Sequence, residues 1–191
     1  MILGKPSASR KPLPRTITYP FLSVEKCNEI IESSTGWIEG TVFKFGQFIT
    51  AKEHRSVLLS KSGISEELED NIFRSIFKTN ADTFRYHLDG LYSKDPILVF
   101  KYSADRSDHY IWHTDLIQDT YIRKLSFSIQ LTDPAEYDGG DLEFMPFIKD
   151  DNIRKQGHIT IFPSFCTHRV TPVTRGIRHV IVGWVYGPEF R

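Results

Sequence analysis

The segment His-Tyr-Ile-Trp-His-Thr-Asp at 109–115 contains an imidazole and a carboxylate two positions apart. On a β-strand, residues at i and i+2 point to the same face of the sheet, so His113 and Asp115 would present their side chains together. Two neighbouring ligands of one metal ion need that arrangement. His168, from a later strand, would complete a set of two imidazoles and one carboxylate.

A set of two imidazoles and one carboxylate leaves open positions on an octahedral metal, which is typical of non-haem Fe(II) oxygenases. A bidentate 2-oxo acid and O₂ would fill those positions. Arg178 follows His168 at a distance of ten residues. Its guanidinium could hold the far carboxylate of the acid, because guanidinium and carboxylate form two parallel hydrogen bonds. The alternative for Arg178 is an ordinary salt bridge with an acid of the segment 136–143.

The segments that must position these residues have the composition of β-strands. After Asp89, short stretches rich in β-branched and aromatic residues alternate with turn signals. They are ILVFKY (97–102), KLSFSIQL (124–131), DLEFM (141–145), HITIF (158–162) and RHVIVGWVY (178–186). In the last stretch, alternation places Arg178 on the same face as Val182 and Trp184. If that face lies inside a barrel, the buried cation needs an anionic partner.

Two helices are predicted before these strands. Ser23 is a suitable N-cap for a helix that ends near Ser33, and Ser65 is a suitable N-cap for a second helix. The second helix has an apolar stripe, formed by Leu68, Ile72, Phe73, Ile76 and Phe77. We therefore expect an α+β fold, mainly β: a double-stranded β-helix (a cupin-like jelly roll) with N-terminal helices backing one sheet.

Length and composition favour a single domain over residues 1–191. We expect an extended N-terminal arm at 1–20, a helical support region at 21–90 and the jelly-roll core at 91–191. Lys and Arg number 24, as do Asp and Glu, so charge gives no reason to expect a nucleic-acid partner. No apolar run approaches the roughly 18 residues that a membrane crossing needs.

The N-terminal segment lacks the apolar core of a signal peptide, and two cysteines are too few for a disulfide framework. We therefore expect a cytoplasmic protein, either a monomer or a homodimer. No nucleic acid and no membrane are expected among its partners.

Three motifs resemble the Fe(II)/2-oxoglutarate-dependent dioxygenases of the prolyl 4-hydroxylase-like branch. They are HTD (113–115), TDPAEYDGGDLEF (132–144) and PSFCTHRVTPVTRGIRHVIVGW (163–184). The second and third are especially similar to the bacterial hydroxylases of that branch, the PKHD type. The resemblance covers residues 97–186. His-x-Asp alone is weak, but the block from His168 to Arg178 makes the combination specific.

The resemblance implies that His113, Asp115 and His168 bind Fe(II) and that Arg178 binds the C5 carboxylate of 2-oxoglutarate. Conversion of 2-oxoglutarate and O₂ to succinate and CO₂ would accompany hydroxylation of a C–H bond, with ascorbate as reductant. The leading substrate is a prolyl residue of a peptide or protein. The alternative is a free amino acid or another small molecule.

Four further residues are expected at the cosubstrate or the substrate. By resemblance, Trp184, Tyr102 and Tyr110 contact 2-oxoglutarate or the substrate, although core packing explains each of them almost as well. Gln130 shares a strand face with Ser126 and Ser128 and is expected to line the same interior.

Other functions compete with the oxygenase. A cupin-like protein could bind a metal or a carboxylate without turnover. A zinc hydrolase could use the same three ligands, but the sequence shows no general base beside them. A nucleic-acid demethylase would have a second arginine at position 184, where this chain has tryptophan. A halogenase would lack the metal carboxylate, and Asp115 is present.

Overall fold

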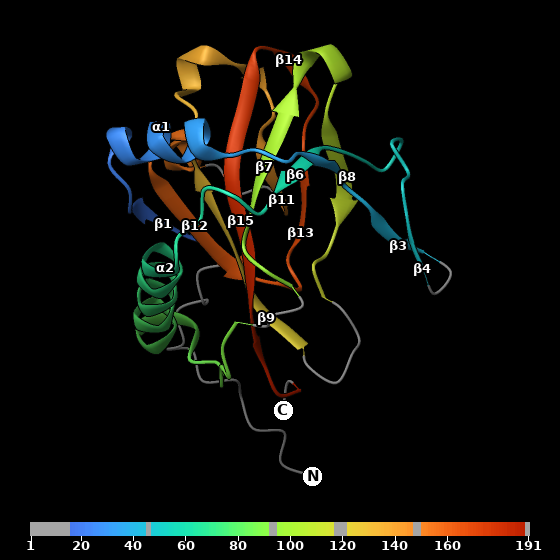
Figure 1. Cartoon of the computed structure of the whole chain (residues 1–191). Helices are drawn as coiled ribbons and strands as arrows, with labels where there is room; N and C mark the ends of the chain where they lie inside the picture. Colours follow the sequence, from blue (N-terminus) through green and yellow to red (C-terminus); the bar gives the residue numbers. More distant parts are fainter. Residues whose placement is uncertain (1–15, 45–46, 92–94, 117–121, 147–149, 190–191) are drawn as a thin grey trace.

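The computed structural model describes residues 16–44, 47–91, 95–116, 122–146 and 150–189, and the side chains of 43–48 are not included. Two antiparallel sheets face each other, and the two long helices lie on the outer side of the larger sheet (Figure 1). The predicted double-stranded β-helix is confirmed. Most of the expected N-terminal arm, residues 1–15, lies outside the described residues.

The larger sheet has seven strands in the order β1-β12-β9-β15-β7-β6-β2. Every neighbouring pair in it is antiparallel. The strands are β1 (Ile17–Pro20), β2 (Ile38–Glu39), β6 (Leu58–Ser60), β7 (Leu98–Ser103), β9 (Ile122–Gln130), β12 (His158–Pro163) and β15 (Ile177–Gly187). β15 lies at the centre, between β9 and β7, and carries Arg178.

The smaller sheet has four strands in the order β11-β13-β8-β5. They are β5 (Arg55–Ser56), β8 (His109–His113), β11 (Leu142–Met145) and β13 (Thr167–Val170). Two further strand pairs flank the sheets: β3 (Val42–Lys44) with β4 (Gln47–Ile49), and β10 (Asp138–Gly139) with β14 (Val173–Arg175). In Figure 1 the β3–β4 hairpin projects from the body of the molecule on the side of β8.

The helices begin where their caps predict. In α1 (Val24–Ser33), the Ser23 hydroxyl accepts a hydrogen bond from the Lys26 amide, and in α2 (Glu66–Thr79) the Ser65 hydroxyl accepts one from the Leu68 amide. Short helical turns cover Asn80–Phe84, Ala104–Arg106, Pro134–Glu136 and Asp151–Arg154. Among the described residues, no helix has the length and apolar content that a membrane crossing requires.

β15 separates two cores because its side chains alternate. On one face, Ile181 and Val185 pack with the buried side of α1 and α2 and with β9 and β12. On the other face, Val180, Trp184 and Tyr186 pack in the interior between the sheets. Arg178 shares this second face and is 3% exposed. The predicted alternation of this strand, including the inward position of Arg178, agrees with the structure.

The expected division of the N-terminal half needs correction. Residues 17–20 of the expected arm form β1 and pair with β12 at the edge of the larger sheet. The expected helical support region at 21–90 also contributes strands to both sheets: β2 and β6 extend the larger sheet, and β5 pairs with β8. These strands have two or three residues, too short for a periodic pattern to reveal.

Two glycines after Tyr137 allow a close approach beneath Arg178. Gly139 has φ +70°, and a Cβ there would lie 2.1 Å from the carbonyl oxygen of Pro172. Gly140 has φ +61°, and a Cβ there would lie 3.1 Å from Cδ of Arg178. The Asp-Gly-Gly motif therefore does more than turn the chain. It lets the 138–140 segment pack against the strand that carries the arginine.

Gly139→Ala should lower the free energy of unfolding more than Gly36→Ala does. Gly36 also has positive φ (+65°), but a Cβ there meets nothing within 4 Å. Gly36→Ala should therefore cost only the left-handed strain of about 1–2 kcal/mol. Gly139→Ala must in addition displace backbone. Urea unfolding of both variants measures the difference, and equal losses would show that the approach to Pro172 is relaxed without cost.

His179, on the outer face of β15, gives a pH-dependent stability. Burial, the larger cause, and the Lys101 ammonium together lower its pKa to about 4. An unfolded histidine titrates near 6.5. The unfolded chain therefore takes up more protons between these values, so stability is complete above pH 6.5 and is lost as pH falls toward 4.

Replacing His179 with glutamine should remove this loss, which amounts to about 2 kcal/mol at pH 5. Urea unfolding at pH 7 and pH 5 measures it in the native protein and the variant. His87→Gln is the control, because the His87 side chain is 77% exposed. If native protein and His179→Gln lost the same stability on acidification, another group would be responsible.

Candidate metal centre

Two side chains of the smaller sheet and one from the segment that follows β8 meet at the inner face of this sheet. His113 is the last residue of β8, Asp115 lies two positions beyond it, and His168 is on β13, opposite His113 in the register. Their potential ligand atoms all lie within 4.8 Å of one another. The structure thus brings together the two imidazoles and the carboxylate that the sequence selects.

Backbone hydrogen bonds fix which nitrogen of each imidazole faces the carboxylate. Nδ1 of His113 lies 2.7 Å from the carbonyl of Ile111, and Nδ1 of His168 lies 3.0 Å from the carbonyl of Cys166. Each Nδ1 therefore carries a proton and donates it to the carbonyl, which turns Nε2 of each ring toward the carboxylate. The Nε2 atoms lie 3.6 Å and 3.5 Å from the two oxygens of Asp115.

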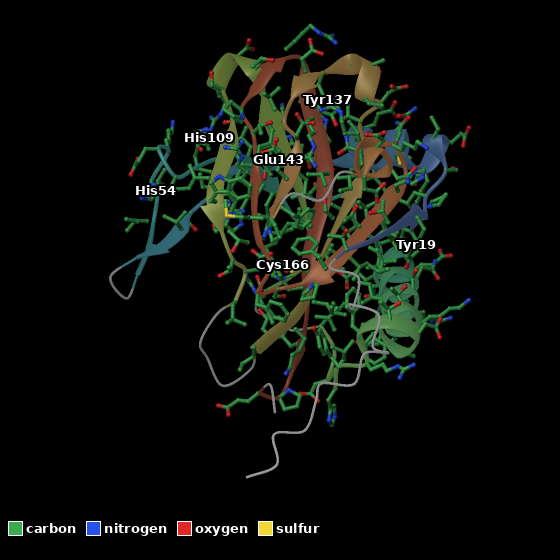
Figure 2. All side chains as sticks on the ribbon, turned by 180° about the vertical axis from the view of Figure 1, so that it is seen from behind. Tyr19, His54, His109, Tyr137, Glu143 and Cys166 are labelled. Atoms are coloured by element: carbon green, nitrogen blue, oxygen red, sulfur yellow. The ribbon has the colours of Figure 1, made fainter. Side chains whose placement is uncertain are left out.

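The approach of Asp115 has a different cause from the one that strand alternation predicts. β8 ends at His113, so Asp115 is outside the strand. Its amide donates to the carbonyl of Ser164 at 2.9 Å, in the turn that precedes β13. Cys166 lies in the same turn, near the middle of the molecule in Figure 2. This turn therefore fixes Asp115 and also supplies the carbonyl that orients His168.

Burial and neighbouring charges set the protonation of the centre. Burial, the larger cause, and the neighbouring His168 together lower the pKa of His113 to about 4, so the imidazole of His113 is neutral near pH 7. Burial alone would raise the pKa of Asp115, but the neighbouring imidazoles and the Arg123 guanidinium lower it below its ordinary value. A neutral imidazole and an ionised carboxylate are the forms that bind a metal.

Arg178 lies in the same interior and lacks a full set of partners. Its Nε donates to Oε1 of Gln130 at 3.0 Å, and its buried Nη1 has no hydrogen-bond partner. Its guanidinium carbon lies 5.5 Å from the ring centre of Tyr102, the residue opposite it on β7. No acidic side chain among the described residues lies within ion-pair distance of Arg178.

The alternative of a salt bridge from the segment 136–143 is therefore not observed. The acids of that segment that form ion pairs bind other arginines: Asp138 binds Arg175, Asp141 binds Arg154, and Glu143 binds Arg169. The guanidinium of Arg178 instead presents an unpartnered buried donor. Such a group is costly unless a ligand satisfies it.

The other expected contact residues lie around the same interior. Gln130 is buried; it accepts from Arg178 and donates from Nε2 to the carbonyl of Thr132, so it orients the arginine. Tyr110 stacks on His113, with ring centres 3.5 Å apart. Trp184 is 8% exposed, and its indole Nε1 is buried without a partner. Whether Tyr102, Tyr110 and Trp184 touch a cosubstrate stays a prediction.

Arg123 is a site residue that the sequence reasoning missed. Its guanidinium carbon lies 3.7 Å from the ring centre of Trp184, and its Nε donates to Asp95 at 2.8 Å. The Tyr186 hydroxyl also donates to Asp95. Strand alternation puts Arg123 on the helix side with Leu125. A bulge between β9 and β15 moves it to the inner face. The position of this bulge cannot be read from the local sequence pattern.

A double-stranded β-helix that holds two histidines and an aspartate between its sheets is the architecture of non-haem Fe(II) oxygenases. The sequence pattern of the 2OG-Fe(II) oxygenase superfamily matches residues 97–186. A PKHD-type hydroxylase of Synechococcus sp. (strain CC9902) is 30% identical over 180 residues, which cover 88% of this chain and 76% of that protein. A PKHD-type hydroxylase from Aliarcobacter butzleri is 26% identical over 84% of this chain and 71% of that protein.

Solved structures of low sequence identity share the fold. A prolyl hydroxylase from Trichoplax adhaerens, in complex with a peptide fragment of a hypoxia inducible factor, has a TM-score of 0.72 at 17% identity, covering 90% of this chain and 83% of its own. A prolyl-4-hydroxylase from Pseudomonas putida has a TM-score of 0.63 at 16% identity, and the match covers 92% of this chain and 94% of that protein. The chain belongs to the 2OG-Fe(II) oxygenase superfamily, within its PKHD-type hydroxylases, and is an oxidoreductase.

His168→Ala should weaken Fe(II) binding by more than about 100-fold, because loss of a ligand should exceed the 10–100-fold that loss of an outer contact costs. Equilibrium dialysis without oxygen, followed by metal analysis, measures the affinity directly. His109→Ala is the matched control: His109 is on the strand of His113, and its Nδ1 contacts the carbonyl of Ser107. Unchanged Fe(II) affinity in His168→Ala would remove His168 from the ligand set.

Proposed function

We propose that this chain couples the oxidation of 2-oxoglutarate by O₂ to the hydroxylation of a C–H bond, with release of succinate and CO₂. The observation that carries the proposal is the combination of His113, Asp115 and His168 with the unpartnered guanidinium of Arg178 in one interior. A metal site alone would fit several functions. A metal site together with a buried cation fits a bidentate acid with a second carboxylate.

The donor set fits Fe(II). Two imidazole nitrogens and one carboxylate suit ferrous iron and leave positions open for other ligands. Bound iron, with 2-oxoglutarate and O₂, would supply the oxidising chemistry. The protein's contribution is to hold the Nε2 atoms of both histidines toward Asp115 by their Nδ1 hydrogen bonds. The turn at Ser164 holds Asp115 in place through its amide.

Arg178 would bind the C5 carboxylate of 2-oxoglutarate. Gln130 occupies the Nε of the guanidinium, so the buried Nη1 stays available for the acid. Tyr102, opposite Arg178 on β7, bounds the same region, and burial raises its pKa to about 12, so its hydroxyl stays a hydrogen-bond donor. Trp184 would close the interior on the side of the metal and exclude water.

The substrate that we propose is a prolyl residue of a peptide or protein. The support is similarity: the relatives are named hydroxylases of the PKHD type, and the Trichoplax structure is a prolyl hydroxylase with a peptide. The β3–β4 hairpin beside β8 would help to hold an extended chain. A free amino acid or another small molecule is the alternative, and ascorbate would keep the iron ferrous.

Succinate formation tests the reaction. Native protein with Fe(II), 2-oxoglutarate and O₂ should form succinate, and ascorbate should prolong the activity. Arg178→Gln should raise the KM for 2-oxoglutarate by at least about tenfold, the equivalent of one charge-assisted hydrogen bond. Arg175→Gln is the control, because the Arg175 side chain is 55% exposed and pairs with Asp138.

Two results would contradict the proposal. A native protein that binds Fe(II) but forms no succinate would favour a cupin-like binding protein. Activity that requires Zn(II) and hydrolyses an ester or amide would favour the hydrolase. For the substrate, succinate formation stimulated by proline-containing peptides supports the prolyl assignment, and stimulation by free amino acids alone supports the alternative.

A further inference from the structure

A third guanidinium, that of Arg55, lies near the metal centre and was not anticipated from the sequence. Arg55 is on β5, the edge strand of the smaller sheet, and pairs with Tyr110 on β8. Figure 2 shows its neighbour His54 beside the β3–β4 hairpin and His109 on the adjacent strand. The carbonyl of His54 accepts a hydrogen bond from the Ile111 amide at 2.9 Å, which fixes this edge against β8.

The contacts of Arg55 leave one edge of its guanidinium unused. Nη1 donates to the carbonyl of Thr41 at 2.9 Å, at the base of the hairpin. The guanidinium carbon lies 4.9 Å from the ring centre of Phe100 and 5.0 Å from that of Tyr110. Nε is buried without a hydrogen-bond partner, and no acidic side chain of the described residues is within ion-pair distance.

Tyr110 connects this guanidinium to the metal centre. One face of the phenol ring is covered by His113 at 3.5 Å in a nearly parallel stack, which leaves no room for a second group on that face. Arg55 therefore lies toward the other face, one aromatic ring away from a predicted metal ligand.

The free edge of Arg55 has the geometry of a carboxylate site. With Nη1 engaged, Nε and Nη2 remain, and these two parallel N–H groups match the two oxygens of a carboxylate. 2-Oxoglutarate does not supply that carboxylate. In the proposed function, one carboxylate of the acid binds at the metal with the keto group and the other binds Arg178. The acceptor must therefore come from another molecule, and the remaining reactant is the substrate.

We propose that Arg55 binds a carboxylate of the substrate through Nε and Nη2, so that the hydroxylated molecule is anionic beside the reacting carbon. This inference rests on the proposed function. The carboxylate has two sources: the α-carboxylate of a free or C-terminal prolyl residue, and an acidic side chain next to an internal prolyl residue. The stack on Tyr110 would place that carboxylate at a fixed distance from the iron.

The alternative is that Arg55 only ties the hairpin to the sheet through Thr41 and the two rings. In that case its replacement would disturb the pocket without any dependence on the charge of the substrate. The decisive comparison is therefore between probes that differ only in that charge.

Calorimetric titration of the Fe(II) and 2-oxoglutarate-loaded protein, without oxygen, makes the comparison. One pair of probes is L-proline and L-prolinamide, and the other is acetyl-Pro-Glu-amide and acetyl-Pro-Gln-amide. In native protein the acid of at least one pair should bind at least about tenfold more tightly than its neutral counterpart. Preference within the first pair assigns the α-carboxylate, and preference within the second assigns an acidic side chain.

In Arg55→Gln that preference should disappear, and in Arg55→Lys it should be partly retained, because lysine keeps the charge without the paired N–H groups. Arg74→Gln is the control; it removes an arginine whose side chain is 76% exposed on α2. The affinity for 2-oxoglutarate is a second readout. If the replacement made the pocket collapse, the affinity for 2-oxoglutarate would fall as much as the affinity for the acid probe.

The proposal is wrong if neither acid is preferred in the native protein, or if Arg55→Gln keeps the preference. It is also wrong if Arg55→Gln weakens the binding of 2-oxoglutarate, of the neutral probe and of the acid probe by the same factor. That result is expected if Arg55 only holds the hairpin against the sheet. Native succinate formation separates the two proposals: with succinate but no acid preference, only the role of Arg55 fails, whereas without succinate the proposed function fails.

Discussion

The rest of the site depends on one electrostatic constraint: an ionised carboxylate, Asp115, is buried between two imidazoles. Burial of the aspartate without compensation would neutralise it. The nearby Arg123 guanidinium and the imidazoles keep its pKa low, while the turn at Ser164 prevents it from reaching solvent. His113 stays neutral because it is buried beside a second imidazole, whereas Asp115 stays charged in spite of its burial. A cation placed between the three side chains would satisfy all of them.

The same interior holds three buried donor atoms without partners among the described residues: Nη1 of Arg178, Nε of Arg55 and Nε1 of Trp184. Buried polar groups are normally paired, so a concentration of unpaired donors in one region indicates that acceptors arrive from outside. All three donors suit anionic or carbonyl oxygens, and none suits a cation. The protein thus provides a metal-binding centre surrounded by groups that bind the oxygen atoms of acids.

Local patterns in the sequence were sufficient for the helices, the five main strands and the inward face of β15, because caps and alternation are properties of neighbouring residues. The pairing of Asp115 with His113 was also anticipated, although the strand ends before Asp115 and a turn supplies the geometry. Arg55 could not be found in this way. Its burial depends on the pairing of β5 with β8 and on the hydrogen bond to the carbonyl of Thr41. Both are contacts between separate segments, and β5, with two residues, is too short to show a periodic pattern.

Two β-bulges account for most of the remaining difference between alternation and structure. On β8, three residues span the distance that two span on β13, so Tyr110 and His113 point to the same face although they are three positions apart. On β9, an extra residue opposite β15 brings Arg123 to the inner face. Each bulge adds one side chain to the metal centre without lengthening the sheet, and each interrupts the two-residue period that would have placed that side chain outside. The stack on His113 and the guanidinium near Asp115 therefore have the same structural origin.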